Sequence, residues 1–366
     1  MKELITVKKF AEESSELYKV FKDYADHVQS LRGVKGKKFS DKSLDDKEKV
    51  INKLFAEEIQ RRAKVSVEDY GGERYMMQYC QNPVVKSFAD AIKDQMIDMI
   101  LPETLFGSMG LIAEIKFADW GDSLSFDLEN NGLYNVSRAG YRQRTAPAQK
   151  LENQTVTLTP INHEVTVGAT LFEILTGRKS IAKEVMKVTR SIESEMLYEA
   201  YQAFVSATDE AVIPSKLRIA NYEEKELVRL CETVTAFNGG RKAVIVGTPI
   251  ALKTILPSNL NLRILLDDEY VRVGHLTNFN GYDVIPMAQI ADYTKSDYSM
   301  RLDDTKVFVV SPSSDKIIKV GVGGTLSHQD GQFDAANLSQ EATTTKAWDT
   351  MCATNSVAGV IDLDAE

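Results

Sequence analysis

The sequence predicts an α+β protein whose first third is helical and whose remainder mixes strands with helices. Apolar residues recur at spacings of three and four up to about residue 100, and they alternate with polar residues from 111. A long helical stripe then starts near Ser180 and is followed by several short apolar runs. Hydrophobic residues make up 43% of the 366 and charged residues 27%, so a sizeable core can form.

Composition excludes several classes of protein. No run approaches the roughly 18 apolar residues that a membrane span requires, and MKELITVKKF lacks the apolar core of a signal peptide. The three cysteines lie far apart without a CxxC pair, which indicates a reducing compartment and argues against a disulfide framework or a zinc site.

The net charge of −9 is unevenly distributed along the chain. Residues 1–64 carry 16 Lys and Arg against 12 Asp and Glu, a net +4 that leaves −13 for the remainder. An excess of four is too small for a dedicated nucleic-acid binder. We therefore expect this basic segment to dock on the acidic body of another copy.

Two amphipathic helices are expected in that segment. Residues 8–31 place apolar side chains in a near-heptad stripe, and residues 44–63 carry a second apolar face. Two interpretations of the first stripe remain open, because it can pack on its own domain or pair between subunits. A further helix near 84–100 is expected to end at Pro102.

Alternating runs at 115–128 and 156–167 flank about twenty residues with little core-forming content. This arrangement predicts a long two-stranded arm that projects from the body. Thr170 to Glu173 has the form of a capping box, and Ser180 is expected to cap a long helix. Further elements are expected as helices at 223–236 and from Pro249, and as strands at 242–247, 282–286, 306–310 and 316–322. In the last forty residues alternation stays weak until 357–363.

The arm's tip carries the one constellation that stands out. No acidic residue occurs from Asn130 to Leu151. The residues expected to make an intersubunit contact are Tyr134, Arg138, Tyr141, Arg142, Arg144 and Lys150. A solvated loop and base stacking on nucleic acid are alternative interpretations. We favour docking on the acidic face of a neighbouring copy, because Arg and Tyr are common interface anchors and the body supplies the opposite charge.

The chemistry-bearing motifs predict no enzyme. Gly121-Asp-Ser123-Leu spells the nucleophile block of GDSL esterases, but Asp-x-x-His occurs at none of the four histidines, which are His27, His163, His275 and His328. A chance tetrapeptide in a strand turn is the better interpretation. The histidines are isolated, the acidic clusters lack calcium-loop spacing, and Gly321–Gly324 lacks a phosphate-binding frame. We expect no catalytic residue, cofactor or metal.

The order of these elements resembles that of a major capsid protein of tailed bacteriophages with the Hong Kong 97-type fold. The resemblance covers the whole chain in organisation and is closest from about 155 to 324, around KAVIVGTPIALKTI and YDVIPMAQIA. It implies an N-terminal helical arm at 1–111, an extended β-hairpin E-loop at 112–168, a peripheral domain with a long spine helix at 169–235, an axial domain with a mixed sheet at 236–324 and a return to the peripheral domain at 325–366.

The resemblance also implies a function. The chain would self-assemble into hexamers and pentamers that form the icosahedral head shell around the phage genome, with packaged double-stranded DNA contacted without sequence specificity. Portal, scaffold or decoration proteins are further implied partners, and no membrane is involved. The implied location is the virion, after assembly in the host cytoplasm.

Two alternatives stay open. An encapsulin-type nanocompartment shell protein of the same fold would enclose a cargo enzyme, although the long basic N-terminal segment fits that class less well. A serine hydrolase using Ser123 would turn over activated esters, but it lacks a histidine partner.

Overall fold

A computed structural model of the chain describes most of its residues. The described residues are 5–32, 37–110, 112–118, 124–129, 133–136, 138, 148–167, 170–209, 213–258, 270, 273–293, 295–312, 315–323, 327–330 and 342–364. Within them the predicted α+β class is confirmed, because the chain is helical as far as Met109 and strands and helices mix thereafter.

The helical first part consists of α1 (Ile5–Glu13), α2 (Ser15–Leu31), α3 (Leu44–Ala63), two short 3-10 turns (Glu68–Tyr70 and Glu73–Tyr75), α4 (Met76–Gln81) and α5 (Pro83–Met109). The apolar stripes predicted for 8–31 and 44–63 are the buried faces of these helices. Phe10, Phe21 and Phe55 are fully buried in one hydrophobic cluster that also contains residues of α5 and of α7 (Ile181–Asp209). The N-terminal helices therefore pack on the body of their own chain.

Polar contacts fasten α3 to the start of α7. The Asn52 side-chain oxygen accepts a hydrogen bond of 3.0 Å from the Ile181 amide, and its Nδ2 donates one of 3.1 Å to the Lys179 carbonyl. Lys183 and Glu48 form an ion pair of 2.9 Å across the same junction. Because the first amides of a helix have no intrahelical acceptor, Asn52 stabilises the beginning of α7 from a distant part of the sequence.

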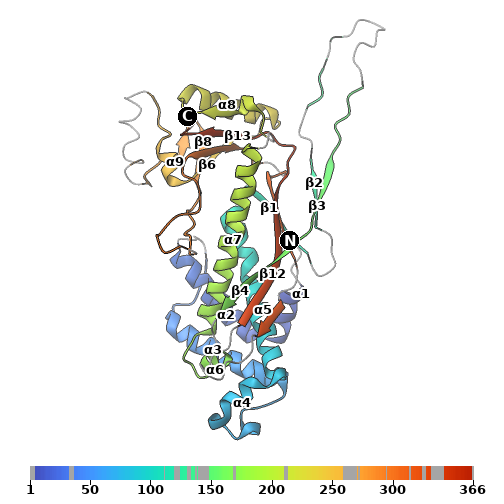
Figure 1. Cartoon of the computed structure of the whole chain (residues 1–366), viewed down its shortest axis with the longest axis vertical. Coiled ribbons are helices and arrows are strands. Elements are labelled where there is room, and N and C mark those ends of the chain that lie inside the picture. Colours follow the sequence, from blue (N-terminus) through green and yellow to red (C-terminus); the bar gives the residue numbers. More distant parts are fainter. Residues whose placement is uncertain are drawn as a thin grey trace.

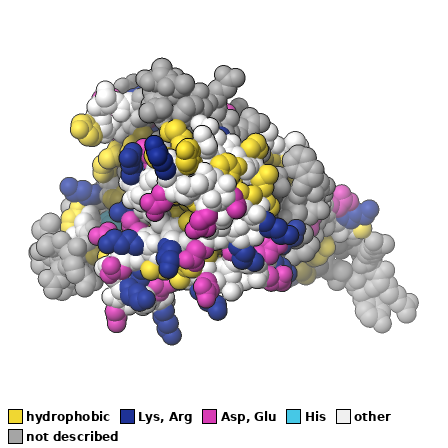
Figure 2. All heavy atoms as spheres, turned by 90° about the horizontal axis from the view of Figure 1, so that it is seen from below, with side chains coloured by type: hydrophobic (Ala, Val, Ile, Leu, Met, Phe, Trp, Pro, Cys, Tyr) yellow, Lys and Arg dark blue, Asp and Glu magenta, His cyan; other side chains and the backbone are white. Residues whose placement is uncertain are grey.

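These contacts correct the expectation that 1–64 docks on another copy. The near-heptad stripe of α2 faces α3 and α5 instead, and the basic side chains find acidic partners nearby, such as Lys37 with Asp26 at 3.0 Å. Figure 2 views the molecule from the end formed by these helices and shows Lys and Arg side chains interspersed with Asp and Glu. A formal charge of +4 along the sequence thus does not make a basic face at this end.

The helix expected to end at Pro102 continues to Met109. Proline removes one hydrogen bond to the carbonyl four residues earlier, a local cost of about 3 kcal/mol. The apolar face of α5 continues beyond the proline with Leu105 and Met109, both fully buried. Burial of that face outweighs the lost hydrogen bond, and the helix is not interrupted.

The helix α6 (Leu171–Leu175) begins with the capping box predicted from the sequence, in which Thr170 and Glu173 satisfy each other's amides. The 29 residues of α7 correspond to about 43 Å. In Figure 1 this helix runs along the middle of the molecule, with the N-terminal helices at one end and a mixed sheet at the other.

That mixed sheet has six strands in the order β5-β13-β9-β6-β8-β7. Its elements are a 3-10 turn (Ser215–Leu217), β5 (Arg218–Ala220), α8 (Glu224–Phe237), β6 (Val244–Gly247), α9 (Pro249–Lys253), β7 (Asn278–Phe279), β8 (Tyr282–Pro286), β9 (Lys306–Val310) and β13 (Gly359–Asp362). The central strands are apolar on both faces because one face packs on α8 and α9 and the other on the end of α7. The predicted strands at 242–247, 282–286 and 306–310 are confirmed.

A second sheet lies along α7 and contains β1 (Ala113–Phe117), β4 (Ile161–Val167), β10 (Ile318–Val322), β11 (Ser327–Asp330) and β12 (Ala342–Cys352). The strand β12 is its centre, since it pairs antiparallel with β4, β10 and β11. Sequence periodicity missed β12 because its buried face consists of Thr344, Lys346 and Trp348. Two polar residues in three remove the alternation that marks a strand.

Sheet membership divides the chain differently from the ranges implied by the resemblance. Strand β5 and helix α8 lie with the six-stranded sheet, although they fall in 169–235. Strand β10 lies in the five-stranded sheet, although it falls in 236–324. Within 325–366, β12 belongs to the five-stranded sheet and β13 to the six-stranded one. Each of these segments has a partner far away in sequence, and local patterns carry no record of such pairing.

Beneath β12, a buried ion pair joins the second sheet to α5. Lys346 Nζ lies 2.9 Å from Asp98 Oδ1, and both side chains are almost fully buried. Asp94, one turn before Asp98, is also largely enclosed, and its Oδ1 has no hydrogen-bond partner among the described residues. Burial, with the carboxylates of Asp98 and Asp90 nearby, raises the pKa of Asp94 to about 7.

We predict that Phe55→Ala lowers the free energy of unfolding by about 3–5 kcal/mol, because it opens a cavity where α3 meets the body. Val50→Ala in the same helix is the control, since Val50 is 40% exposed, and it should cost less than about 0.5 kcal/mol. Denaturant unfolding measures both. Equal small effects would show that α3 is not part of the subunit core.

Asp94 predicts a pH dependence of stability. The folded state keeps its proton up to a pH of about 7, whereas the unfolded chain releases it near the ordinary value of 3.8, so this group's contribution to stability falls as pH rises between these values. Asp94→Asn should therefore gain about 1–3 kcal/mol over the wild type on going from pH 5 to pH 8. Asp45→Asn, which changes an acid whose side chain is 81% exposed, is the control. A gain that does not grow with pH would contradict the assignment.

Candidate functional site: the hairpin and its anchor

A two-stranded hairpin projects from the body and is the candidate functional site. Strands β2 (Leu124–Leu128) and β3 (Gln154–Leu158) pair antiparallel from Leu124 opposite Leu158 to Leu128 opposite Gln154. Figure 1 shows the hairpin leaving the side of the molecule and extending past the six-stranded sheet. The predicted arm is present, with its paired root at 124–158, while β1 and β4 on either side belong to the five-stranded sheet.

The root of the hairpin has a small core of its own. Leu124, Phe126 and Leu158 are buried with Ala118, and Met351 of β12 packs against them. The contact with β10 is close at Gly321, where a Cβ atom would lie 2.9 Å from Leu124 Cδ1. Glycine at this position therefore lets the hairpin lie directly on the five-stranded sheet.

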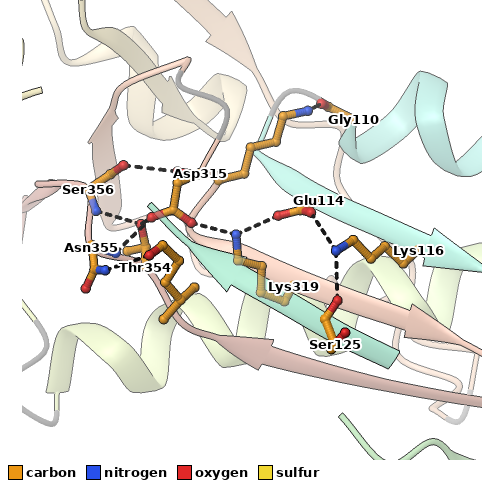
Figure 3. A network of polar contacts seen from close by, with 11 residues as sticks. Gly110, Glu114, Lys116, Ser125, Asp315, Lys319, Thr354, Asn355 and Ser356 are labelled. Atoms are coloured by element: carbon orange, nitrogen blue, oxygen red, sulfur yellow. Dashed lines mark hydrogen bonds and ion pairs between the residues drawn. The ribbon is translucent and has the colours of Figure 1, made fainter. Parts of the chain in front are cut away.

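A buried lysine organises the polar contacts at the root (Figure 3). Lys319 of β10 is fully buried, and its Nζ lies 2.7 Å from Asp315 Oδ1 and 2.7 Å from Glu114 Oε2. Asp315 is itself fully enclosed. Two acids flank one ammonium, so each buried charge has a partner of opposite sign.

Asp315 extends this network to the last residue of β2. Its Oδ2 accepts hydrogen bonds from the Thr354 hydroxyl at 3.0 Å and from the Asn355 amide at 2.9 Å. The Asn355 side chain in turn donates to the Leu128 carbonyl at 3.1 Å. The buried carboxylate thus holds the turn after β12, and Asn355 of this turn holds the last residue of β2.

Glu114 extends the network to the beginning of β2. It pairs with Lys116 at 3.4 Å, and Lys116 donates to the Ser125 carbonyl at 2.7 Å. The same ammonium lies 4.6 Å from the centre of the Phe126 ring, a cation–π contact. Both ends of β2 are therefore connected to Lys319, which fixes the hairpin's direction relative to the sheet.

The described distal part of the hairpin has one cross-connection and several unpartnered apolar side chains. Gln149 bridges the two sides by accepting from the Asn135 amide at 2.8 Å and donating to its carbonyl at 2.9 Å. Leu133, Tyr134 and Val136 are 81%, 59% and 98% exposed. Exposed apolar side chains on a projecting arm are typical of an interaction surface, so they favour the interpretation of this loop as a contact region.

Of the six predicted contact residues, the structure describes three. Tyr134, Arg138 and Lys150 are exposed on the two sides of the distal hairpin. Tyr141, Arg142 and Arg144 lie outside the described residues, and the part of all six in a contact stays a prediction. Sequence reasoning chose the charged and aromatic residues and missed Leu133 and Val136, which lie beside them in the same loop.

Among the residues considered for chemistry, His163 has a packing role. Ser123 lies outside the described residues. His163 stacks on Trp348 with ring centres 3.8 Å apart, and its Nε2 lies 3.0 Å from Glu199 Oε1. Burial raises the pKa of Glu199, and hydrogen bonds from Trp348 and His163 oppose this shift. This group fastens β4 and β12 to α7.

The cysteines and acids lead to the same assessment. Burial raises the pKa of the Cys352 thiol to about 11 and those of Cys80 and Cys231 to about 12, so these thiols stay protonated at neutral pH. In the part of the chain that is described, no three His, Cys, Asp or Glu side chains gather in a way that could hold a metal ion. None of the described helices has the length and apolarity to cross a bilayer.

Comparison with known proteins finds similarity in structure alone. No protein-family model matches the sequence, and no curated protein matches it. The chain is similar to the mature capsid protein of bacteriophage PhiM1, with 10% identity, 69% of this chain and 86% of that chain covered, and a TM-score of 0.43. It is also similar to the virus-like particle from Pyrococcus furiosus (10%, 74% and 99%, TM-score 0.42) and to the capsid of cyanophage P-SCSP1u (9%, 70% and 88%, TM-score 0.44).

The anchor predicts a specific loss of stability. Lys319→Met leaves Asp315 buried without its cation, and we expect the free energy of unfolding to fall by about 3–5 kcal/mol. Amide hydrogen exchange should also become faster in 124–128 and 154–158. Lys53→Met, at a side chain 78% exposed, is the control. The double variant Lys319→Met/Asp315→Asn removes both charges and should be more stable than Lys319→Met alone. If it is not, the two residues do not act as a buried pair.

Proposed function

We propose that this chain is a major capsid protein that self-assembles into hexamers and pentamers, which build the icosahedral head shell around a phage genome. One observation carries the proposal: a rigidly anchored hairpin that projects from the body with apolar and basic side chains exposed. A single copy has no use for such an arm, whereas a shell needs each subunit to hold its neighbours.

The anchor at the root supports this proposal. An arm that binds a neighbour must keep its direction from copy to copy, because small angular errors add up around a closed shell. The buried Lys319 network and the contact at Gly321 fix that direction. Preorganisation of this kind also lowers the entropy lost on association.

The composition of the distal hairpin supports self-association in particular. The exposed apolar residues supply contact area, and Arg138 and Lys150 add positive charge to a stretch without acids. The whole chain carries −9, so a second copy offers opposite charge to the arm. The three similar solved structures are themselves shell proteins, two phage capsids and one virus-like particle.

The partners follow from this role as part of the proposal. Packaged double-stranded DNA would be enclosed without sequence-specific contacts, and portal, scaffold or decoration proteins would bind the assembled shell. The location is the virion, after assembly in the host cytoplasm. As part of this proposal the chain acts as a structural protein and not as an enzyme; His27 and His163 stack on aromatic rings, and burial keeps the thiols protonated, which supports this role.

Negative-stain electron microscopy of the purified protein tests the proposal, and closed shells of uniform size are the expected result. Shells that form only around a co-expressed enzyme would instead favour the nanocompartment alternative. The absence of any assembly, together with ester hydrolysis that Ser123→Ala abolishes, would favour the hydrolase.

Charge reversal in the distal hairpin, compared with the same charge reversal on α3, tests the role of the arm. Arg138→Glu/Lys150→Glu should leave a soluble subunit with unchanged circular dichroism and a much smaller fraction in shells at low salt, because both charges would then be repelled by the acidic neighbour. The matched variant Lys49→Glu/Lys53→Glu changes the same charge at exposed positions of α3 and should assemble normally. Normal shells from the arm variant would show that its charge plays no part in docking.

A further inference from the structure

An arginine on the long helix α7 has no partner in the subunit. Arg190 is half-buried, and its Nε is enclosed without a hydrogen-bond acceptor. In the part of the chain that the structure describes, no acid lies within ion-pair distance of its guanidinium. By contrast, Arg62 of α3 is largely enclosed and pairs with Glu58 at 2.6 Å. A guanidinium withdrawn from water is costly unless an anion pairs with it, so we expect Arg190 to have a partner outside the subunit.

A second guanidinium lies close to Arg190. Arg32 follows the last residue of α2, and its positive charge and the Glu193 carboxylate are the full charges that act most strongly on Arg190. Burial and the charge of Arg32 lower the pKa of Arg190, although an arginine stays protonated at neutral pH. Glu193, one turn after Arg190, lies 3.8 Å from Arg32 Nη1. Two guanidinium groups thus have one carboxylate between them, and one positive charge is in excess.

Exposed aromatic rings lie next to these arginines. Tyr293 and Tyr298, in the turn between β8 and β9, are 91% and 95% exposed, and Tyr293 is close enough to act electrostatically on Arg190. This turn is fastened to α7, where Arg301 Nη2 donates to Glu195 Oε1 at 3.0 Å. In Figure 1 the turn lies beside α7, between the six-stranded sheet and the N-terminal helices. Tyr293 is therefore presented to the arginines from a fixed base.

The chemistry of these side chains favours a phosphate group as the missing anion. A guanidinium binds phosphate oxygens through two parallel hydrogen bonds, and a phosphate has enough oxygens to engage two such groups at once. A carboxylate has two oxygens, which a single guanidinium already engages. An exposed tyrosine ring offers a stacking surface for a base attached to the phosphate. Phosphate, either free or within a nucleic-acid strand, fits this set of groups.

We propose that Arg32 and Arg190 form a phosphate-binding site between the end of α2 and the first half of α7, with Tyr293 at its edge. Arg190 binds the phosphate from its half-buried position, and the exposed Arg32 covers it from the solvent side. This site goes beyond the proposed function and does not require it. Microscopy of shells tests the capsid function and phosphate binding tests the site, so the two proposals can fail separately.

Thermal unfolding of the full-length protein in inorganic phosphate tests the site. Phosphate stabilises folded proteins in general, so the measured quantity is the difference in Tm shift between variants at equal phosphate. At a phosphate concentration of about 100 times Kd, we expect the Tm of the wild type to rise by about 3 °C more than that of Arg190→Met. Arg229→Met removes the same charge from a side chain that is 75% exposed on α8, and it should keep the wild-type shift. Equal shifts in the wild type and Arg190→Met would overturn the proposal.

The same method separates a binding role of Arg190 from a structural one. In phosphate-free buffer Arg190→Met should be at least as stable as the wild type, because it removes an unpaired charge and keeps the apolar stem. Arg62→Met removes an arginine that is paired within the subunit, and its Tm should fall. A comparable fall for Arg190→Met would show that Arg190 stabilises the subunit through its own contacts, and the proposal would then be wrong.

A fluorescent oligothymidylate distinguishes a nucleic-acid phosphate from free phosphate, with binding followed by fluorescence anisotropy at low salt. If strand phosphates occupy the site, Arg190→Met and Tyr293→Ser should each weaken binding by about tenfold or more, and Arg229→Met should not. If only free phosphate occupies it, all variants bind the oligonucleotide equally, while the phosphate-dependent Tm shift still requires Arg190. Loss of neither oligonucleotide binding nor the Tm shift in Arg190→Met would exclude both sources and with them the site.

Discussion

The projecting hairpin depends on one buried lysine. Lys319 of β10 has no exposed surface, and its ammonium is neutralised by Asp315 and Glu114. From these acids, hydrogen bonds reach both ends of β2, through Asn355 to the Leu128 carbonyl and through Lys116 to the Ser125 carbonyl. Displacing either member of a buried ion pair is costly, because the other charge is then left unpaired in a medium of low polarity. The network thus holds in place an arm that has little apolar core of its own.

Buried polar groups recur wherever β12 joins the body. Lys346 pairs with Asp98 of α5, and Trp348 donates to Glu199 of α7 at 2.7 Å while His163 stacks on its ring. Apolar packing alone would let a strand slide along the helices beneath it, whereas these contacts fix its register. The register of β12 then determines where the turn at Thr354 and Asn355 lies, and hence where the hairpin is held.

The subunit buries the large apolar faces of its N-terminal helices and leaves single apolar side chains exposed at several places. The amphipathic faces of α2 and α3 are buried against α5 and α7, so the N-terminal segment contributes to the subunit's own core. Large apolar side chains that stay exposed among the described residues include Leu133 and Val136 of the distal hairpin and Phe237 and Ile250 beside the six-stranded sheet.

The sequence by itself determined the elements whose signal is local. It predicted the helical first part, the long helix after Ser180, the capping box at Thr170 and the two-stranded arm, because apolar periodicity and capping residues act within a few positions. It also selected Tyr134, Arg138 and Lys150 as exposed residues of the arm.

Only the tertiary structure decided what depends on distant partners. Helix α5 passes Pro102 because its continuing apolar face finds partners, and β12 forms around Lys346 because Asp98 lies opposite it, some 248 residues away. Burial of Lys319, exposure of Tyr298 and the fate of the N-terminal helices likewise follow from long-range packing. A local pattern shows which face of an element is apolar, but the rest of the chain decides what covers that face.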